Sequence, residues 1–178
     1  MKKDNILQNN ACCSTLFLSL MIVSGLYFTS IIKRMPCGGN LTDRFYSNFV
    51  HTDFIHLIKN LYVLYSLSRV EKDLGSKTFT KLIVFLLISN TVIESIFRKI
   101  FPRITCSVGF SGILIGVTIF DLFNEDDKYD KGLLTSVVIE FFYPILKDNK
   151  VSMSGHITGM ISGFISSIIW LKLYKKKI

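Results

Sequence analysis

Cysteines and charged residues are scarce in this chain of 178 residues, and their scarcity excludes several kinds of protein. The four cysteines have neither the spacing of metal ligands nor the density of a disulfide scaffold, so we expect no metal site and no disulfide framework. Charged residues make up 19% of the chain, whereas apolar residues make up 49% and gather in long blocks. This pattern excludes a soluble globular protein and a disordered chain.

Basic residues outnumber acidic ones, 21 to 13, but they occur in short clusters between the apolar blocks. They form no continuous basic face, so nucleic acid is not an expected partner. Such clusters are typical of membrane flanks, and the expected partner is the lipid bilayer. The length is that of one domain, which we place over residues 1–178.

Six apolar segments are candidates for membrane spans. They cover roughly residues 11–32, 54–70, 82–97, 104–123, 133–146 and 151–173. The first contains 22 residues without a charge, enough at about 1.5 Å per residue to cross a hydrocarbon core of about 30 Å. The fifth is short and contains Glu140 and Pro144, so we expect it to be irregular or at the edge. The predicted fold is an all-α membrane protein, a bundle of six transmembrane helices.

The distribution of positive charge predicts the orientation. Loops on the side of the two termini carry more Lys and Arg than the opposite loops, which places both termini in the cytosol. The last four residues, 175–178, resemble a dilysine retrieval signal, or are simply a basic flank; in a eukaryote this favours the endoplasmic reticulum or Golgi. Asn40 begins a glycosylation sequon in the predicted lumenal loop.

Polar residues inside spans are costly and are therefore candidates for function. His56 and Asn60 lie four residues apart on one face of the second span, Ser111 lies in the fourth and His156 in the sixth. Even-numbered spans enter from the same face of the membrane. These four residues should therefore meet at one depth, near the non-cytosolic side.

Two pairs of small residues predict close packing between the fourth and sixth spans: Gly112 with Gly116, and Gly159 with Gly163. Such packing would bring Ser111 to His156, which could accept the serine proton as general base. His56, Asn60 and the Ser111 backbone N–H are candidate donors to an oxyanion.

Other readings of these residues stay open. Each element alone could be a packing feature, and Glu94 is interpreted as interfacial or locally hydrogen bonded.

The chain has neither a pair of intramembrane aspartates nor a His-Glu-x-x-His helix, which argues against aspartyl and zinc intramembrane proteases. No acidic residue adjoins Ser111 or His156 in sequence, so we expect a Ser-His dyad without a third carboxylate and without a cofactor.

Between about Arg44 and Gly163 the chain resembles the rhomboid intramembrane serine proteases. The matching segments are Arg44 with Phe49-Val50-His51, His56-Leu57-Ile58-Lys59-Asn60, Glu71 with Gly75-Ser76, Gly109-Phe110-Ser111-Gly112, and His156-Ile157-Thr158-Gly159 with Gly163. The chain looks like the short, six-span members of the secretory pathway.

This resemblance implies Ser111 as nucleophile and His156 as general base and acid, with His56 and Asn60 as oxyanion donors. It implies structural roles for the glycines of the motifs and for Glu71 and Gly75. The implied function is hydrolysis of peptide bonds in or near the transmembrane helices of single-span substrates. The chain departs from the pattern at Ile115, where many members have an aromatic residue. The alternatives are therefore an inactive rhomboid-like protein that binds membrane helices for quality control or trafficking, and, less supported, a small transporter.

Overall fold

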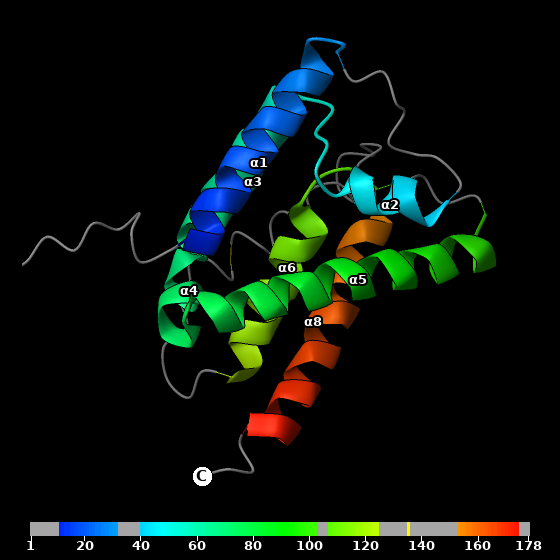
Figure 1. Cartoon of the computed structure of the whole chain (residues 1–178). Coiled ribbons are helices and arrows are strands. Elements are labelled where there is room, and N and C mark those ends of the chain that lie inside the picture. Colours follow the sequence, from blue (N-terminus) through cyan, green and yellow to red (C-terminus); the bar gives the residue numbers. More distant parts are fainter. Residues whose placement is uncertain (1–10, 32–39, 103–106, 125–134, 136–152, 175–178) are drawn as a thin grey trace, which may run out of the picture.

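A computed structural model describes residues 11–31, 40–102, 107–124, 135 and 153–174 (Figure 1). Every regular element in these ranges is a helix, which confirms the predicted α class. In chain order the helices are α1 (Ala11–Phe28), α2 (Leu41–Ser47), α3 (Phe54–Ser66), α4 (Ser68–Leu74), α5 (Ser76–Ile100), α6 (Ser111–Asn124) and α8 (Met153–Tyr174). The fifth predicted span, 133–146, lies outside the described residues except at Thr135.

The outward faces of the long helices are apolar. Helices α1 and α5 are long and apolar enough to cross a bilayer, and α6 is a shorter apolar helix. Leu18 and Ile22 of α1, and Ile88 and Ile96 of α5, are more than half exposed. Surfaces of this kind are unfavourable in water and suited to lipid. The exposed apolar side chains agree with a membrane protein. That the chain has six spans remains a prediction.

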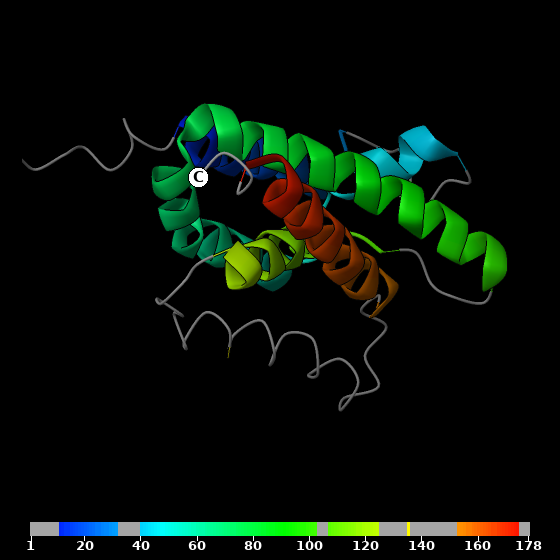
Figure 2. The same ribbon diagram turned by 90° about the horizontal axis from the view of Figure 1, so that it is seen from below.

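Three helices, α5, α6 and α8, make the most extensive contacts among the described elements. Figure 1 shows α5 crossing α6 and α8, and in both views α6 and α8 lie side by side (Figure 2). The interior between the helices is filled by fully buried side chains, among them Phe79, Leu86, Phe110, Ile113 and Phe120. This packing fixes the relative positions of the N-terminal ends of α6 and α8, where Ser111 and His156 lie.

Helix α1 lies beside α3, and its first turn is held by Glu71 of α4. The buried Glu71 carboxylate accepts the backbone N–H of Cys12 at 2.9 Å and that of Cys13 at 2.8 Å. N–H groups in a first helical turn have no partner within their own helix, so this carboxylate supplies one. Burial raises the pKa of Glu71, but hydrogen bonds from Ser76 and from these N–H groups outweigh it and hold the pKa below its usual value.

Near the site, the structure shows one helix that the sequence analysis did not predict and one helix that begins later than the predicted span. The first loop contains the short helix α2, whose first turn is capped by the side chain of Asn40, which accepts the N–H of Asp43 at 2.8 Å. Helix α6 begins at Ser111 rather than near residue 104, because the preceding Gly109 has a φ of 108° that cannot continue a helix. Ser111 is therefore the first residue of its helix and follows directly from a non-helical segment.

Candidate active site

Ser111 and His156 face each other at the start of two packed helices. The distance from Ser111 Oγ to His156 Nε2 is 3.1 Å, although the residues are 45 positions apart. Both are buried, with 7% and 2% of their surfaces exposed. A serine hydroxyl at this distance from an imidazole nitrogen can pass its proton to that nitrogen.

Glycines allow α6 and α8 to approach closely enough for this contact. A Cβ placed on Gly159 would lie 2.1 Å from the carbonyl oxygen of Gly112, and one on Gly163 would lie 2.5 Å from that of Gly116. Real side chains do not tolerate such distances, so backbone packs directly on backbone. The sequence paired these four glycines within each span, and in the structure Gly159 contacts Gly112 and Gly163 contacts Gly116.

Gly109 brings the side chains of α3 to the segment that leads into Ser111. Its N–H donates to the carbonyl of Ser47 at 2.9 Å, which ties the segment to the end of α2. A Cβ on Gly109 would lie 2.6 Å from His56 Cε1 and 3.4 Å from Asn60 Nδ2. The two expected donors therefore lie against the backbone two residues before Ser111, and only glycine leaves room for them there.

Helix α3 holds these two side chains one turn apart. Asp53 caps the helix, since its carboxylate accepts the N–H of His56 at 2.7 Å. Asn60 lies one turn further on and is fully buried. The cap fixes where the helix begins, and with it which face carries the histidine and the amide.

His51 belongs to the same group of residues, although sequence reasoning gave it no role. It is fully buried, and its ring lies 5.1 Å from that of His56 in an edge-to-face arrangement. Its Nε2 lies 2.7 Å from Asn60 Nδ2. The chain contains three histidines, and all three gather here. That scarcity, together with the five-residue spacing between His51 and His56, was a signal in the sequence.

The other side of the site is formed by α5. Glu94 is 1% exposed and accepts hydrogen bonds from both the hydroxyl and the backbone N–H of Ser107. Asn90, one turn earlier, donates to the side-chain oxygen of Asn48 at 3.3 Å. A Cβ on Gly155 would lie 2.6 Å from Cβ of Ser107, so this segment also touches the start of α8. Glu94 is thus buried and locally hydrogen bonded, one of the two readings that the sequence left open.

The chemistry available here is that of a serine and an imidazole. Across the described ranges no three His, Cys, Asp or Glu side chains gather as metal ligands. Cys12 and Cys13 are free thiols in the first turn of α1, the turn that Glu71 holds.

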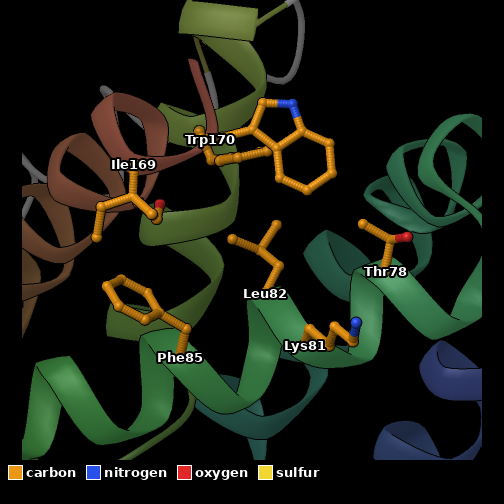
Figure 3. Close-up of a pocket in the computed structure, with 8 residues that line it drawn as sticks. Thr78, Lys81, Leu82, Phe85, Ile169 and Trp170 are labelled. Carbon is orange, nitrogen blue, oxygen red and sulfur yellow. The ribbon is translucent and has the colours of Figure 1, made fainter. Parts of the chain in front are cut away.

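A pocket of about 180 Å³ lies between α5, α6 and α8, away from this site (Figure 3). It is lined by Thr78, Lys81, Leu82, Phe85, Phe120, Ser166, Ile169 and Trp170. Figure 3 shows Leu82 and Phe85 of α5 opposite Ile169 and Trp170 of α8. Trp170 follows His156 by 14 residues of one helix, or roughly 21 Å. The pocket therefore contributes nothing to the Ser111–His156 pair.

Comparisons with known proteins identify the family of this chain. A family model described as the rhomboid domain matches residues 38–173. A protein of Acanthamoeba polyphaga mimivirus, provisionally named a rhomboid protein, is 27% identical over 158 residues, which cover 86% of this chain and 89% of the viral protein. Rhomboid-like protein 15 of Arabidopsis thaliana is 30% identical over 146 residues, 68% of this chain but only 35% of the plant protein. Since the matched region includes Ser111, His156, His56 and Asn60 and most of the chain, the protein belongs to the rhomboid family, a family of integral membrane proteins.

Proposed function

We propose that this chain is an intramembrane serine endopeptidase that hydrolyses peptide bonds in or near the transmembrane helices of its substrates. The observation that carries the proposal is the 3.1 Å approach of Ser111 Oγ to His156 Nε2, beside a segment against which His56 and Asn60 lie. A packing role would require none of these groups to converge. Acyl transfer uses all of them, as nucleophile, base and oxyanion donors.

In the first half of the reaction His156 Nε2 takes the proton of Ser111 as Oγ attacks the carbonyl carbon of the scissile bond. The carbonyl π electrons move onto oxygen and give a tetrahedral oxyanion. When that intermediate collapses the C–N bond breaks, and the imidazolium returns its proton to the leaving amine. The product is an ester between Ser111 and the N-terminal part of the substrate.

In the second half a water molecule replaces the amine. His156 takes a proton from the water, whose oxygen attacks the ester carbonyl. The C–O bond to Ser111 breaks, and the proton passes to Ser111 Oγ. A carboxylic acid leaves and the enzyme is restored without a cofactor.

The developing oxyanion needs donors that are already in position. Asn60 carries an amide and His56 an imidazole beside Gly109, and Ser111 is the first residue of α6, where N–H groups lack a partner within the helix. Loss of one such donor commonly lowers the rate by about 100- to 1000-fold. We expect that range for Asn60→Ala.

The proposed substrates are single-span membrane proteins. A transmembrane helix containing small or helix-breaking residues exposes its carbonyls most readily, because its local hydrogen bonds are weak. We place the site toward the non-cytosolic side with both termini in the cytosol. In a eukaryotic cell the corresponding membrane would be that of the endoplasmic reticulum or Golgi.

One observation favours a second candidate, a helix-binding protein without proteolytic activity. Ile115, which is 3% exposed, occupies the position where the family resemblance led us to expect an aromatic residue. An aliphatic side chain cannot stack on His156 as a ring does. This candidate predicts that substrate helices bind equally to the parent, Ser111→Ala and His156→Ala, and that none of the three cleaves them.

Cleavage of a panel of single-span substrates in reconstituted vesicles separates the two candidates. The parent should cleave at least one substrate, and Ser111→Ala and His156→Ala should not. Ser162→Ala is the matched control, because Ser162 is a fully buried serine of α8 whose hydroxyl donates to the Thr158 carbonyl at 2.8 Å. It should cleave as the parent does. A folded parent that binds these helices without cleaving any would favour the second candidate.

A further inference from the structure

His51 contacts three parts of the molecule: helix α1, helix α3 and the segment that leads into Ser111. The proposed reaction depends on the relative positions of the last two. Its Nδ1 lies 3.0 Å from Ser24 Oγ of α1. Its Nε2 lies 2.7 Å from Asn60 Nδ2 of α3 and 3.4 Å from the backbone nitrogen of Phe110. Ser24, His51, Asn60 and Phe110 are all fully buried, so water does not compete for these contacts.

The contact with Phe110 determines the protonation of the ring. A backbone N–H can only donate, so His51 Nε2 must accept and cannot carry a hydrogen. In the neutral ring the hydrogen then lies on Nδ1, which donates it to Ser24 Oγ. A neutral ring agrees with the environment, since burial, helped by His56 and opposed by Asp53, lowers the pKa of His51 to about 3.

The same reasoning determines which end of the Asn60 amide faces His51. Because Nε2 is an acceptor, the atom 2.7 Å away must be the amide nitrogen. That nitrogen carries two hydrogens, and one of them is used by His51. The other is left to point elsewhere, and this nitrogen lies beside Gly109, 3.4 Å from where a Cβ would be. Because His51 binds one N–H of the Asn60 amide, it also fixes the direction of the second N–H.

We propose that His51 is a positioning residue. As a double acceptor it orients the Asn60 amide for oxyanion binding and holds the backbone N–H of Phe110, the residue before Ser111, and it is itself oriented by Ser24. The inference rests on the proposed function, because an amide has an oxyanion to bind only if the chain catalyses acyl transfer. Through Ser24, helix α1 also contributes to the arrangement of the site, although no residue of α1 is proposed to act on the substrate.

The test compares parent, His51→Ala, His51→Gln and Ser24→Ala on one reconstituted single-span substrate. A fluorophosphonate probe, left to react to completion, counts competent sites, so that kcat is expressed per working site. We expect kcat of His51→Ala to fall about 10- to 100-fold with KM within about twofold, less than the loss for deleting a donor. His51→Gln, whose side-chain oxygen can occupy the place of Nε2, should recover much of the loss. Ser24→Ala should show a smaller fall in kcat.

A double-mutant cycle distinguishes positioning from mere support of the fold. If His51 acts mainly through Asn60, the fold-change in kcat caused by His51→Ala should shrink several-fold in an Asn60→Ala background. Leu20→Ala, at a fully buried core position of α1, is the control for lost stability: it should lower the unfolding temperature without lowering kcat per site.

Two results would overturn the inference and leave the protease proposal intact. One is the same fold-change in kcat for His51→Ala in the parent and in the Asn60→Ala background. The other is an unchanged kcat per site in His51→Ala. If His51→Ala does not fold, His51→Gln and Ser24→Ala decide, and an unchanged kcat per site in both overturns the inference. A parent that cleaves nothing overturns the protease proposal and the inference with it.

Discussion

Gly159 of α8 lies directly against the carbonyl oxygen of Gly112 of α6, so closely that a Cβ on Gly159 would be 2.1 Å from it. This contact is three residues from His156 on one helix and one residue from Ser111 on the other. The spacing of the Ser111–His156 pair therefore depends on the absence of a side chain at this point.

Gly159→Ala should separate α6 from α8 and weaken both fold and activity. Overpacking of this kind costs about 1–3 kcal/mol of stability, and the Ser111–His156 contact should lengthen. Thermal unfolding and the rate of labelling by a serine-reactive probe measure the two effects. Gly25→Ala is the control, because nothing lies within 4 Å of a Cβ there. Equal behaviour of the two variants would show that the close packing of α6 and α8 is not needed.

Gly109→Ala and Gly75→Ala form a second matched pair. Both glycines have positive φ, 108° and 77°, so both substitutions strain the backbone, at a cost of about 1–3 kcal/mol. Only at Gly109 does the new Cβ meet a side chain, that of His56, whereas Gly75 has nothing within 4 Å. We expect cleavage per folded molecule to be lost in Gly109→Ala and kept in Gly75→Ala. A similar loss in both would assign the effect to strain alone.

Glu71→Gln should destabilise the fold without changing the chemistry. The carboxylate accepts two N–H groups of the first turn of α1, and charged hydrogen bonds of this kind contribute about 1.5–3 kcal/mol each. Because the pKa of Glu71 is lowered on folding, its contribution is present above its unfolded value, 4.5, and is lost as pH falls through the folded value. The parent and Glu71→Gln should therefore differ in unfolding temperature at pH 7 and converge in acid. Asp73→Asn, which removes an exposed neighbouring carboxylate, should show no such difference.

His51 predicts a separate loss of stability at milder acidity. Its ring stays neutral in the folded state until the pH approaches about 3, whereas in the unfolded chain it takes up a proton near its usual 6.5. The unfolded state then binds more protons between these values, so stability falls as pH falls from about 6.5 toward 3. His51→Gln removes this group and should lose less stability over the same interval. Parallel curves of unfolding temperature against pH would contradict the buried, neutral histidine.

Much of the candidate site could be predicted because its residues are polar or small where an apolar span is expected. Ser111, His156, His56 and Asn60 are recognisable for that reason, and glycines at four-residue spacing indicate which helices approach. The start of α6 could not be predicted from hydropathy, since Ile104 and Val108 are apolar although residues 107–110 are non-helical. The positive φ of Gly109 determines that α6 begins only at Ser111.

Contacts between distant segments could not be predicted from the sequence, for a physical reason. Glu71 and Cys13 are 58 residues apart, and Ser24 and His51 are 27 apart. Each of these pairs joins groups that could equally find partners nearby in the sequence or in water. Only the packing of α1 beside α3 and α4 brings them together, and periodicity within a single helix does not report which helices are neighbours.

The site of covalent labelling tests most directly whether Ser111 is a nucleophile. The reconstituted parent is treated with a fluorophosphonate probe and the modified residue is identified by mass spectrometry, alongside Ser111→Ala, His156→Ala and Ser162→Ala. We predict modification of Ser111 in the parent and in Ser162→Ala, and none in the other two variants. A folded parent that is not modified, or is modified equally in Ser111→Ala, would contradict a nucleophilic Ser111.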